Sequence, residues 1–129
     1  MLAILRIVAG LVFVSAGTMK MFGQPPSPVP IPPFTPFSEL GVGAVLETFG
    51  GAAIVLGLLT RPVAFVLAGE MAVAYFQFHF PRSFFPTVNN GIPAVLYCFL
   101  FLYLSAAGAG AWSLDGIIVR RRGRAPRRG

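Results

Sequence analysis

The sequence has few charged side chains and few of the residues that build redox or metal centres. Only 11% of its 129 residues are Asp, Glu, Lys or Arg, and it contains one cysteine and one histidine. Soluble domains carry about 25% charged residues, so this composition is atypical of a soluble protein. A single cysteine excludes an intramolecular disulfide, and a single histidine excludes bis-histidine haem ligation within one chain. The sequence also lacks a phosphate-cradling glycine loop and a Cys-x-x-Cys pair.

Four apolar stretches fill most of the chain instead, at about residues 2–22, 40–60, 62–80 and 91–111. Each is close to the 20 or so apolar residues that a helix needs to cross a bilayer. The first stretch also resembles a signal peptide, but it continues past a cleavage-like Val14-Ser15-Ala16 and carries a polar face, which favours a retained helix. We therefore predict an all-α fold, a membrane four-helix bundle over residues 1–119, followed by a basic tail at 120–129.

The distribution of arginine predicts the orientation of these helices. Six of the nine arginines lie in the tail and Arg61 lies in the short second connection, whereas the two other loops hold only Arg82. Because Lys and Arg are enriched on the cytoplasmic side, both termini should be cytoplasmic, with the Pro-rich loop 24–38 outside. A basic cluster just beyond a transmembrane helix is expected to meet anionic lipid headgroups, and nothing beside it suggests nucleic-acid binding.

Four ionisable residues interrupt the apolar stretches: Arg6, Lys20, Glu47 and Glu70. A charge in hydrocarbon costs at least about 2.5–3.5 kcal/mol, so such residues are usually paired or functional. Helical periodicity places Arg6 and Lys20 on one glycine-containing face of the first helix. The relative depths of these four residues along the predicted membrane helices predict two ion pairs, Lys20 with Glu47 and Arg6 with Glu70.

Three further polar residues lie toward the outer ends of the third and fourth helices. His79 is nine residues from Glu70 and is expected to point away from it. Asn90 is a good N-cap for the fourth helix and shares a face with Tyr97. Three interpretations of all seven residues remain open: they hold the helices in register, they line an outward-facing pocket for a small polar molecule or a quinone headgroup, or they bind a metal. No close ligand spacing supports the metal, and we assign neither a metal site nor a catalytic residue.

The same residues carry a resemblance to a known family, the DoxX family of small bacterial membrane proteins. The resemblance covers nearly the whole chain apart from the Pro-rich loop and the arginine-rich tail. Its motifs are Arg6, Gly10, Gly17 and Lys20, then Glu47, Gly50-Gly51, Gly57 and Thr60-Arg61-Pro62, then Glu70-Met71, Ala74-Tyr75 and His79, then Asn89, Gly91 and Leu96-Tyr97, and finally Gly108 and Trp112-Ser113-Leu114-Asp115. One departure is Ile92, where members of the family typically have an acidic residue after Asn-x-Gly.

The resemblance implies a four-helix protein of the bacterial inner membrane and indicates two functions. The first is a non-catalytic small subunit or scaffold of a redox or oxidative-stress complex, which would have other protein subunits as partners and would not be an enzyme on its own. The alternative is a quinone-interacting subunit of a membrane oxidoreductase of the thiosulfate:quinone type, for which a quinone would be the cofactor. A small-solute transporter is a distant third, and a homo-oligomer is compatible with all three.

Overall fold

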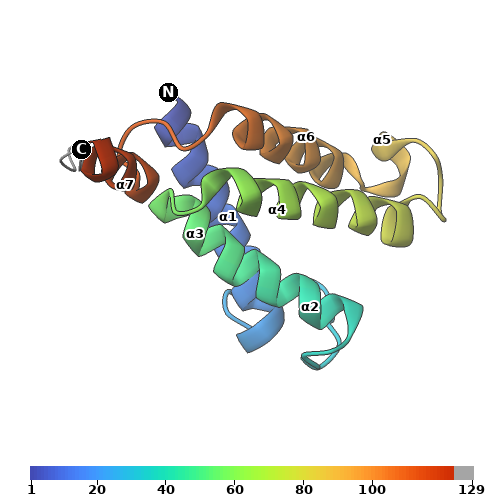
Figure 1. Cartoon of the computed structure of the whole chain (residues 1–129). Helices are drawn as coiled ribbons and strands as arrows, with labels where there is room; N and C mark the ends of the chain where they lie inside the picture. Colours follow the sequence, from blue (N-terminus) through green and yellow to red (C-terminus); the bar gives the residue numbers. More distant parts are fainter. Residues whose placement is uncertain (124–129) are drawn as a thin grey trace.

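The computed structural model describes residues 1–123, and every regular element among them is helical, as the sequence predicts (Figure 1). Two of these elements, η1 and η2, are π-helical turns that continue neighbouring α-helices without a break. The order along the chain is α1 (Leu2–Phe22), α2 (Glu39–Val45), η1 (Leu46–Gly50), α3 (Gly51–Leu56), α4 (Thr60–Ala74), η2 (Tyr75–His79), α5 (Pro86–Asn89), α6 (Ile92–Ala107) and α7 (Leu114–Gly123).

The long helices pack mainly as two pairs. α1 packs along the continuous helix formed by α2, η1 and α3, while α4 packs along α6. Figure 1 shows that the pairs lie close together at the end of the molecule that carries α7 and diverge toward the opposite end. We call these the α7 end and the loop end; the loop end carries residues 23–38 and α5. A cleft lies between the two pairs and is lined by residues of α1, α2, α4 and α6.

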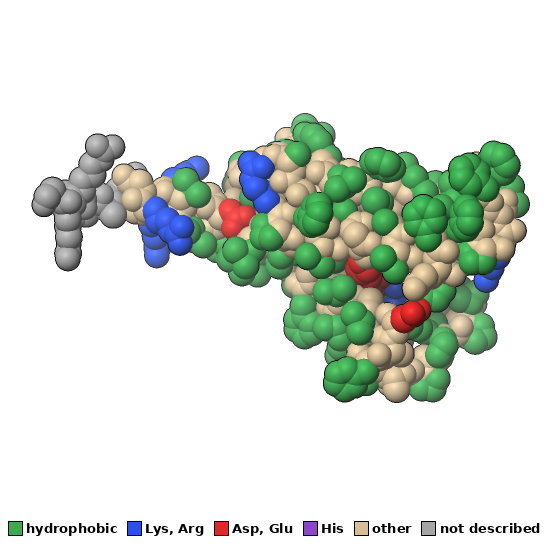
Figure 2. All heavy atoms as spheres, turned by 45° about the vertical axis from the view of Figure 1, so that its right-hand side comes forward, with side chains coloured by type: hydrophobic (Ala, Val, Ile, Leu, Met, Phe, Trp, Pro, Cys, Tyr) green, Lys and Arg blue, Asp and Glu red, His purple; other side chains and the backbone are tan. Residues whose placement is uncertain are grey.

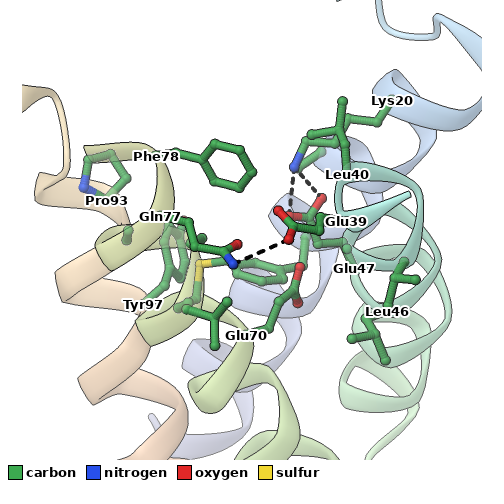
Figure 3. A pocket seen from close by; sticks show the side chains of 18 of the residues that line it. Lys20, Glu39, Leu40, Leu46, Glu47, Glu70, Gln77, Phe78, Pro93 and Tyr97 are labelled. Carbon is green, nitrogen blue, oxygen red and sulfur yellow. Dashed lines mark hydrogen bonds and ion pairs between the residues drawn. The ribbon is translucent and has the colours of Figure 1, made fainter. Parts of the chain in front are cut away.

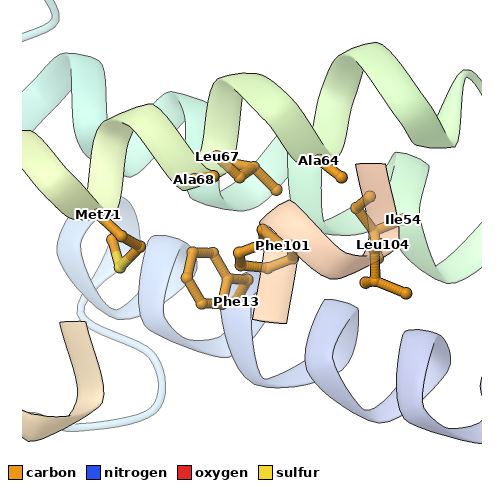
Figure 4. Close-up of a cluster of buried hydrophobic side chains, with 8 residues drawn as sticks. All are labelled: Phe13, Ile54, Ala64, Leu67, Ala68, Met71, Phe101 and Leu104. Atoms are coloured by element: carbon orange, nitrogen blue, oxygen red, sulfur yellow. The ribbon is translucent and has the colours of Figure 1, made fainter. Parts of the chain in front are cut away.

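A small apolar core joins the two pairs where they meet. It contains Phe13 from α1, Ile54 from α3, Phe101 and Leu104 from α6, and four residues of α4, namely Ala64, Leu67, Ala68 and Met71 (Figure 4). Phe13 makes an edge-to-face contact with Phe101, with ring centroids 4.6 Å apart. Such a contact adds about 0.5–1.5 kcal/mol to the burial of the two rings.

Large apolar side chains also cover much of the outer surface, as the green areas of Figure 2 show. Phe49, Phe65, Phe76, Leu96 and Phe99 are each more than 60% exposed and come from both helical pairs. Extended apolar surface of this kind on a soluble monomer would mark an interaction or membrane site. The distribution is what helices in contact with lipid require.

Two helices are long and apolar enough to cross a membrane by themselves: Leu2–Phe22 and Glu39–Leu56. Ile92–Ala107 is apolar but shorter. The fourth predicted stretch therefore forms a shorter helix than expected, because Gly108 ends it with a φ of 83°, a backbone conformation that glycine adopts readily. The second stretch is shortened in the same way, because Gly57 ends α3 in the left-handed conformation.

The segment after α6 folds back onto the α7 end. The Ser113 hydroxyl accepts a hydrogen bond from the Gly116 N–H and so caps the start of α7. Of the predicted tail, residues 120–123 are the last turn of α7, and Arg124, Arg127 and Arg128 lie outside the described residues. Residues 120–123 of the predicted tail are thus helical, because they continue α7 from its capped N-terminus.

Candidate functional site

The predicted ion pair between Lys20 and Glu47 is present. The Lys20 Nζ lies 2.7 Å from Glu47 Oε1 and 2.9 Å from Oε2, so one ammonium donates to both carboxylate oxygens. Glu47 is buried and its side chain is only 5% exposed, whereas that of Lys20 is 25% exposed. The lysine therefore reaches inward from the last turn of α1 to a carboxylate in the interior.

Close approach of the two backbones allows this pairing. A Cβ at Gly17 would collide with Thr48 and the Ala44 carbonyl, and one at Gly10 would lie 2.7 Å from the Gly51 carbonyl oxygen. Glycine at both positions lets α1 lie directly against η1 and α3. The glycine face predicted for the first helix is thus its contact with the second helical segment.

Glu47 lies within the π-helical turn η1, which the sequence did not predict. A π-turn closes hydrogen bonds over five residues and therefore shifts the following helix face by roughly one residue, about 100°. Gly51, after the turn, faces the α1 backbone, but Gly43, before it, faces Glu70 of α4. The small-residue stripe through Glu47 thus contacts two neighbours rather than one.

Glu70 reaches the same place from α4, and it forms no ion pair within residues 1–123. Its Oε1 approaches Gly43, and its Oε2 is buried without a hydrogen-bond partner among the described residues. Figure 3 shows the Glu70 carboxyl below that of Glu47, with Lys20 above. Two carboxyl groups therefore converge on one ammonium group in a largely apolar surrounding.

The predicted pair of Arg6 and Glu70 is wrong. Arg6 is fully buried at the α7 end, where it donates five hydrogen bonds to backbone carbonyls. Two acceptors, Ile54 and Val55, are in the last turn of α3, and the other three are in the turn of residues 109–112. The carbonyls at a helix C-terminus lack intrahelical partners and attract cations, which explains why the guanidinium is held there. Arg6 fixes the fold and does not line the cleft.

The cleft between the two helical pairs has a volume of about 850 Å³. Lys20, Glu47 and Glu70 form its polar centre, and Leu40, Leu46, Phe78 and Tyr97 are among its apolar walls (Figure 3). At its rim Gln77 donates a long hydrogen bond of 3.4 Å to Glu39. An apolar cavity with a few converging polar groups is the usual form of a small-molecule site.

His79 and Tyr97 also line this cleft. His79 lies in the π-turn η2, and its expected orientation away from Glu70 stays a prediction. The His79 Nδ1 lies 3.0 Å from the Asn89 carbonyl oxygen. Tyr97 packs edge-to-face against Phe13, with ring centroids 4.9 Å apart, and so connects the cleft to the core.

Asn90 is not the N-cap of α6, and the buried asparagine is its neighbour Asn89. Asn90 is exposed and ends α5 with a φ of 59°, the left-handed conformation that an Asn-Gly pair favours. Asn89 is 1% exposed; its side chain donates to Tyr75 and to the Ser83 carbonyl and accepts from the Gly91 N–H. The Asn-Gly dipeptide is the signal that would have placed the turn at Asn90.

Residues 1–123 contain no group of three or more His, Cys, Asp or Glu that could hold a metal ion. The structure thus brings together Lys20, Glu47, Glu70, His79 and Tyr97 around one cleft. Arg6 lies away from this cleft at the α7 end, and Asn90 lies on the surface.

Comparison with known proteins gives one family match and two similar sequences. The family model described as DoxX matches residues 1–80. An uncharacterized protein of Haemophilus influenzae is 43% identical over 123 residues, which cover 93% of this chain and 92% of the relative. The inner membrane protein YqjF of Escherichia coli is 31% identical over 123 residues, covering 90% of each chain. No solved structure matches the chain.

Proposed function

Because the chain belongs to the DoxX family of membrane proteins, we propose that it crosses the bacterial inner membrane four times as a four-helix bundle with both termini in the cytoplasm. A relative of 31% identity is itself named an inner membrane protein. α4 and η2 form one uninterrupted helix over residues 60–79, about 30 Å long at 1.5 Å per residue, which matches the hydrocarbon thickness. The shorter α6 is accommodated by local thinning of the bilayer.

The proposed orientation places the α7 end on the cytoplasmic side. Arg61 and the arginines of α7 lie at this end, whereas the Pro-rich loop lies at the other. Reporter fusions after Gly129 and within residues 27–37 should report opposite compartments. Equal reporting from both fusions would contradict the topology.

We further propose that the chain is a non-catalytic small subunit whose cleft holds a quinone-type ligand. The observation that supports this most strongly is the convergence of Lys20, Glu47 and Glu70 in a cleft of about 850 Å³ with apolar walls. An ammonium group donates to a quinone carbonyl oxygen, and a carboxylate accepts from a quinol hydroxyl. The walls offer Phe78 and Tyr97 as contacts for the ring, and an isoprenoid tail would extend into the bilayer.

A quinone in this cleft would need an electron donor, so the proposal includes a partner subunit of a redox or oxidative-stress complex. Cys98, the one thiol, is not among the cleft residues, and the cleft side chains serve to bind and orient the ring. Isolation from native membranes should yield a stable partner that carries a flavin, a haem or a rhodanese-like domain. Isolation of the chain alone under conditions that preserve known membrane complexes would count against the partner.

Heat protection of the purified chain tests the ligand. Ubiquinone or menaquinone analogues should raise its melting temperature in detergent, because a ligand that binds only the native state stabilises it by mass action. The protection should weaken in Lys20→Met and Glu47→Gln, each measured against its own ligand-free melting temperature. Arg82→Gln, which changes an exposed residue outside the cleft, is the matched control. If no quinone shifts the melting of a folded sample, the ligand proposal fails and a purely structural subunit remains.

A further inference from the structure

A second cavity, of about 670 Å³, lies at the α7 end and shares no lining residue with the cleft. Three arginines line it: Arg61 from the first turn of α4, and Arg120 and Arg122 from the last turns of α7. In Figure 2 blue side chains gather at the end of the molecule that carries α7. The cavity thus combines cationic groups from two elements that are far apart in the sequence.

Arg61 is held in place by the backbone around it. Its Nη1 donates to the carbonyls of Ser105, at 3.3 Å, and of Ala106 in the last turn of α6. Its guanidinium lies against Gly108, where a Cβ would be only 3.2–3.4 Å from the group. One edge of the guanidinium is therefore used for anchoring. Within residues 1–123 its Nε and Nη2 make no hydrogen bond, so donors remain for a ligand.

The single carboxylate that lines the cavity, that of Asp115, already accepts two hydrogen bonds from the backbone. Asp115 accepts hydrogen bonds from the backbone N–H groups of Leu59, at 2.8 Å, and Thr60, at 2.9 Å. It therefore caps the start of α4 and does not pair with Arg120 or Arg122, whose guanidinium groups donate no hydrogen bond to residues 1–123. The cavity is lined by three arginines and one carboxylate, which already accepts hydrogen bonds from the backbone. Its net positive charge favours an anion.

Apolar residues flank these cations. Leu59 and Val119 are 60% and 69% exposed, and Ile118 is 40% exposed. All three line the same cavity. A free phosphate ion would use only the arginines, whereas a phospholipid would also cover the apolar flank with its glycerol and acyl chains.

We infer that this cavity binds the headgroup of an anionic phospholipid, with Arg61, Arg120 and Arg122 on the phosphate and Leu59, Ile118 and Val119 beside the acyl chains. Guanidinium groups suit this ligand because their planar donors match phosphate oxygens. The inference is independent of the quinone proposal and needs only that the α7 end meets a membrane surface. It predicts a defined lipid site rather than general attraction to a charged bilayer.

Native mass spectrometry of the full chain in mild detergent tests the site by counting retained lipids. Phosphatidylglycerol should be retained in preference to phosphatidylcholine of the same acyl chains. Arg120→Gln and Arg122→Gln should each lower the affinity for phosphatidylglycerol about fivefold, the factor expected for one basic residue. Arg121→Gln is the matched control, because Arg121 carries the same charge on the same helix but does not line the cavity. It should leave the retention nearly unchanged.

Two results would overturn the inference. One is an equal loss in all three variants, which would mean that the segment attracts anions only through its net charge. The other is full displacement of the lipid by inorganic phosphate or by soluble glycerophosphoglycerol at equal concentration, which would show that the apolar flank contributes nothing. Lipid-free melting temperatures of the four proteins should agree, since the substituted side chains are exposed and make no hydrogen bond to residues 1–123.

Discussion

At the scale of single residues, the four charged residues of the apolar stretches have two roles. Lys20 and Glu47 were predicted as partners from helix periodicity and depth, and the structure confirms the pair. Arg6 was paired wrongly, because a sequence shows the depth of a charge but not which backbone carbonyls lack partners. The acceptors of Arg6 arise only when α3 ends at Gly57 and the 109–112 turn folds beside it.

The role of Arg6 predicts a large and specific loss of stability on substitution. Arg6→Met removes five hydrogen bonds to backbone carbonyls and should lower the free energy of unfolding by about 3 kcal/mol or more. Arg6→Lys should recover only part of this loss, because an ammonium cannot reproduce the planar fork. Denaturant unfolding in detergent measures both. Wild-type stability in Arg6→Lys would show that charge alone matters.

The pair of Lys20 and Glu47 predicts coupling between two substitutions. Glu47→Ala leaves the Lys20 ammonium without its partner and should lower folded yield, whereas Lys20→Met in the same chain should restore part of it. A double-mutant cycle on unfolding free energy should give a coupling of about 1–3 kcal/mol. Additive effects of the two substitutions would mean that the contact contributes no stability.

At the scale of elements, the long helices were predictable, the short helices α5 and α7 were not predicted, and the faces of the long helices were predicted only in part. Apolar length located the helices, and the predicted first helix, 2–22, coincides with α1. The π-turns η1 and η2 have no signature in a period of 3.6 residues, so the sequence did not predict that Gly43 and Gly51 contact different neighbours. Both π-turns line the cleft, and such turns are frequent at functional sites.

Neighbouring asparagines give a matched test of the turn before α6. Asn89→Ala removes three hydrogen bonds of a buried side chain and should cost about 2–3 kcal/mol of stability. Asn90→Ala changes an exposed residue in the left-handed conformation and should cost about 1 kcal/mol. Thermal unfolding of the two variants side by side checks the order. A larger loss for Asn90→Ala would contradict the assignment of Asn89 as the buried anchor.

The cap that Asp115 places on α4 predicts a pH dependence. Burial by itself would raise the pKa of Asp115, but the backbone N–H groups of Thr60 and Leu59, together with the charge of Arg6, hold this pKa below its ordinary value. A lowered folded-state pKa contributes stability that is present above the unfolded value of about 3.9 and is lost as pH falls through the folded value.

Stability should therefore fall below about pH 4 in the wild-type chain, and Asp115→Asn should remove this component while lowering stability at pH 7. Melting temperatures between pH 3 and pH 7 measure the effect. Parallel curves for wild type and Asp115→Asn would show that the carboxylate is not the group that titrates.

At the scale of the whole molecule, the two helical pairs meet at the α7 end and separate toward the loop end. At the meeting end, Arg6 connects α1 to α3 and to the 109–112 turn, and Asp115 connects α7 to the start of α4, whereas the open end holds the cleft. Composition predicted the membrane setting of this arrangement. An outward-facing pocket was one of three interpretations that the polar residues left open. The shape of the cleft was not predicted, because it depends on how far the two helical pairs diverge.

Photo-crosslinking with an azido-quinone tests the central claim, that the cleft is a ligand site, most directly. In detergent or nanodiscs the label should be found by peptide mass spectrometry on cleft residues of α2, η1, α4 and η2, such as Leu46, Phe78 and His79. Excess unlabelled quinone should suppress it. Labelling spread over outward-facing residues such as Phe65 and Phe99, without competition, would contradict the account.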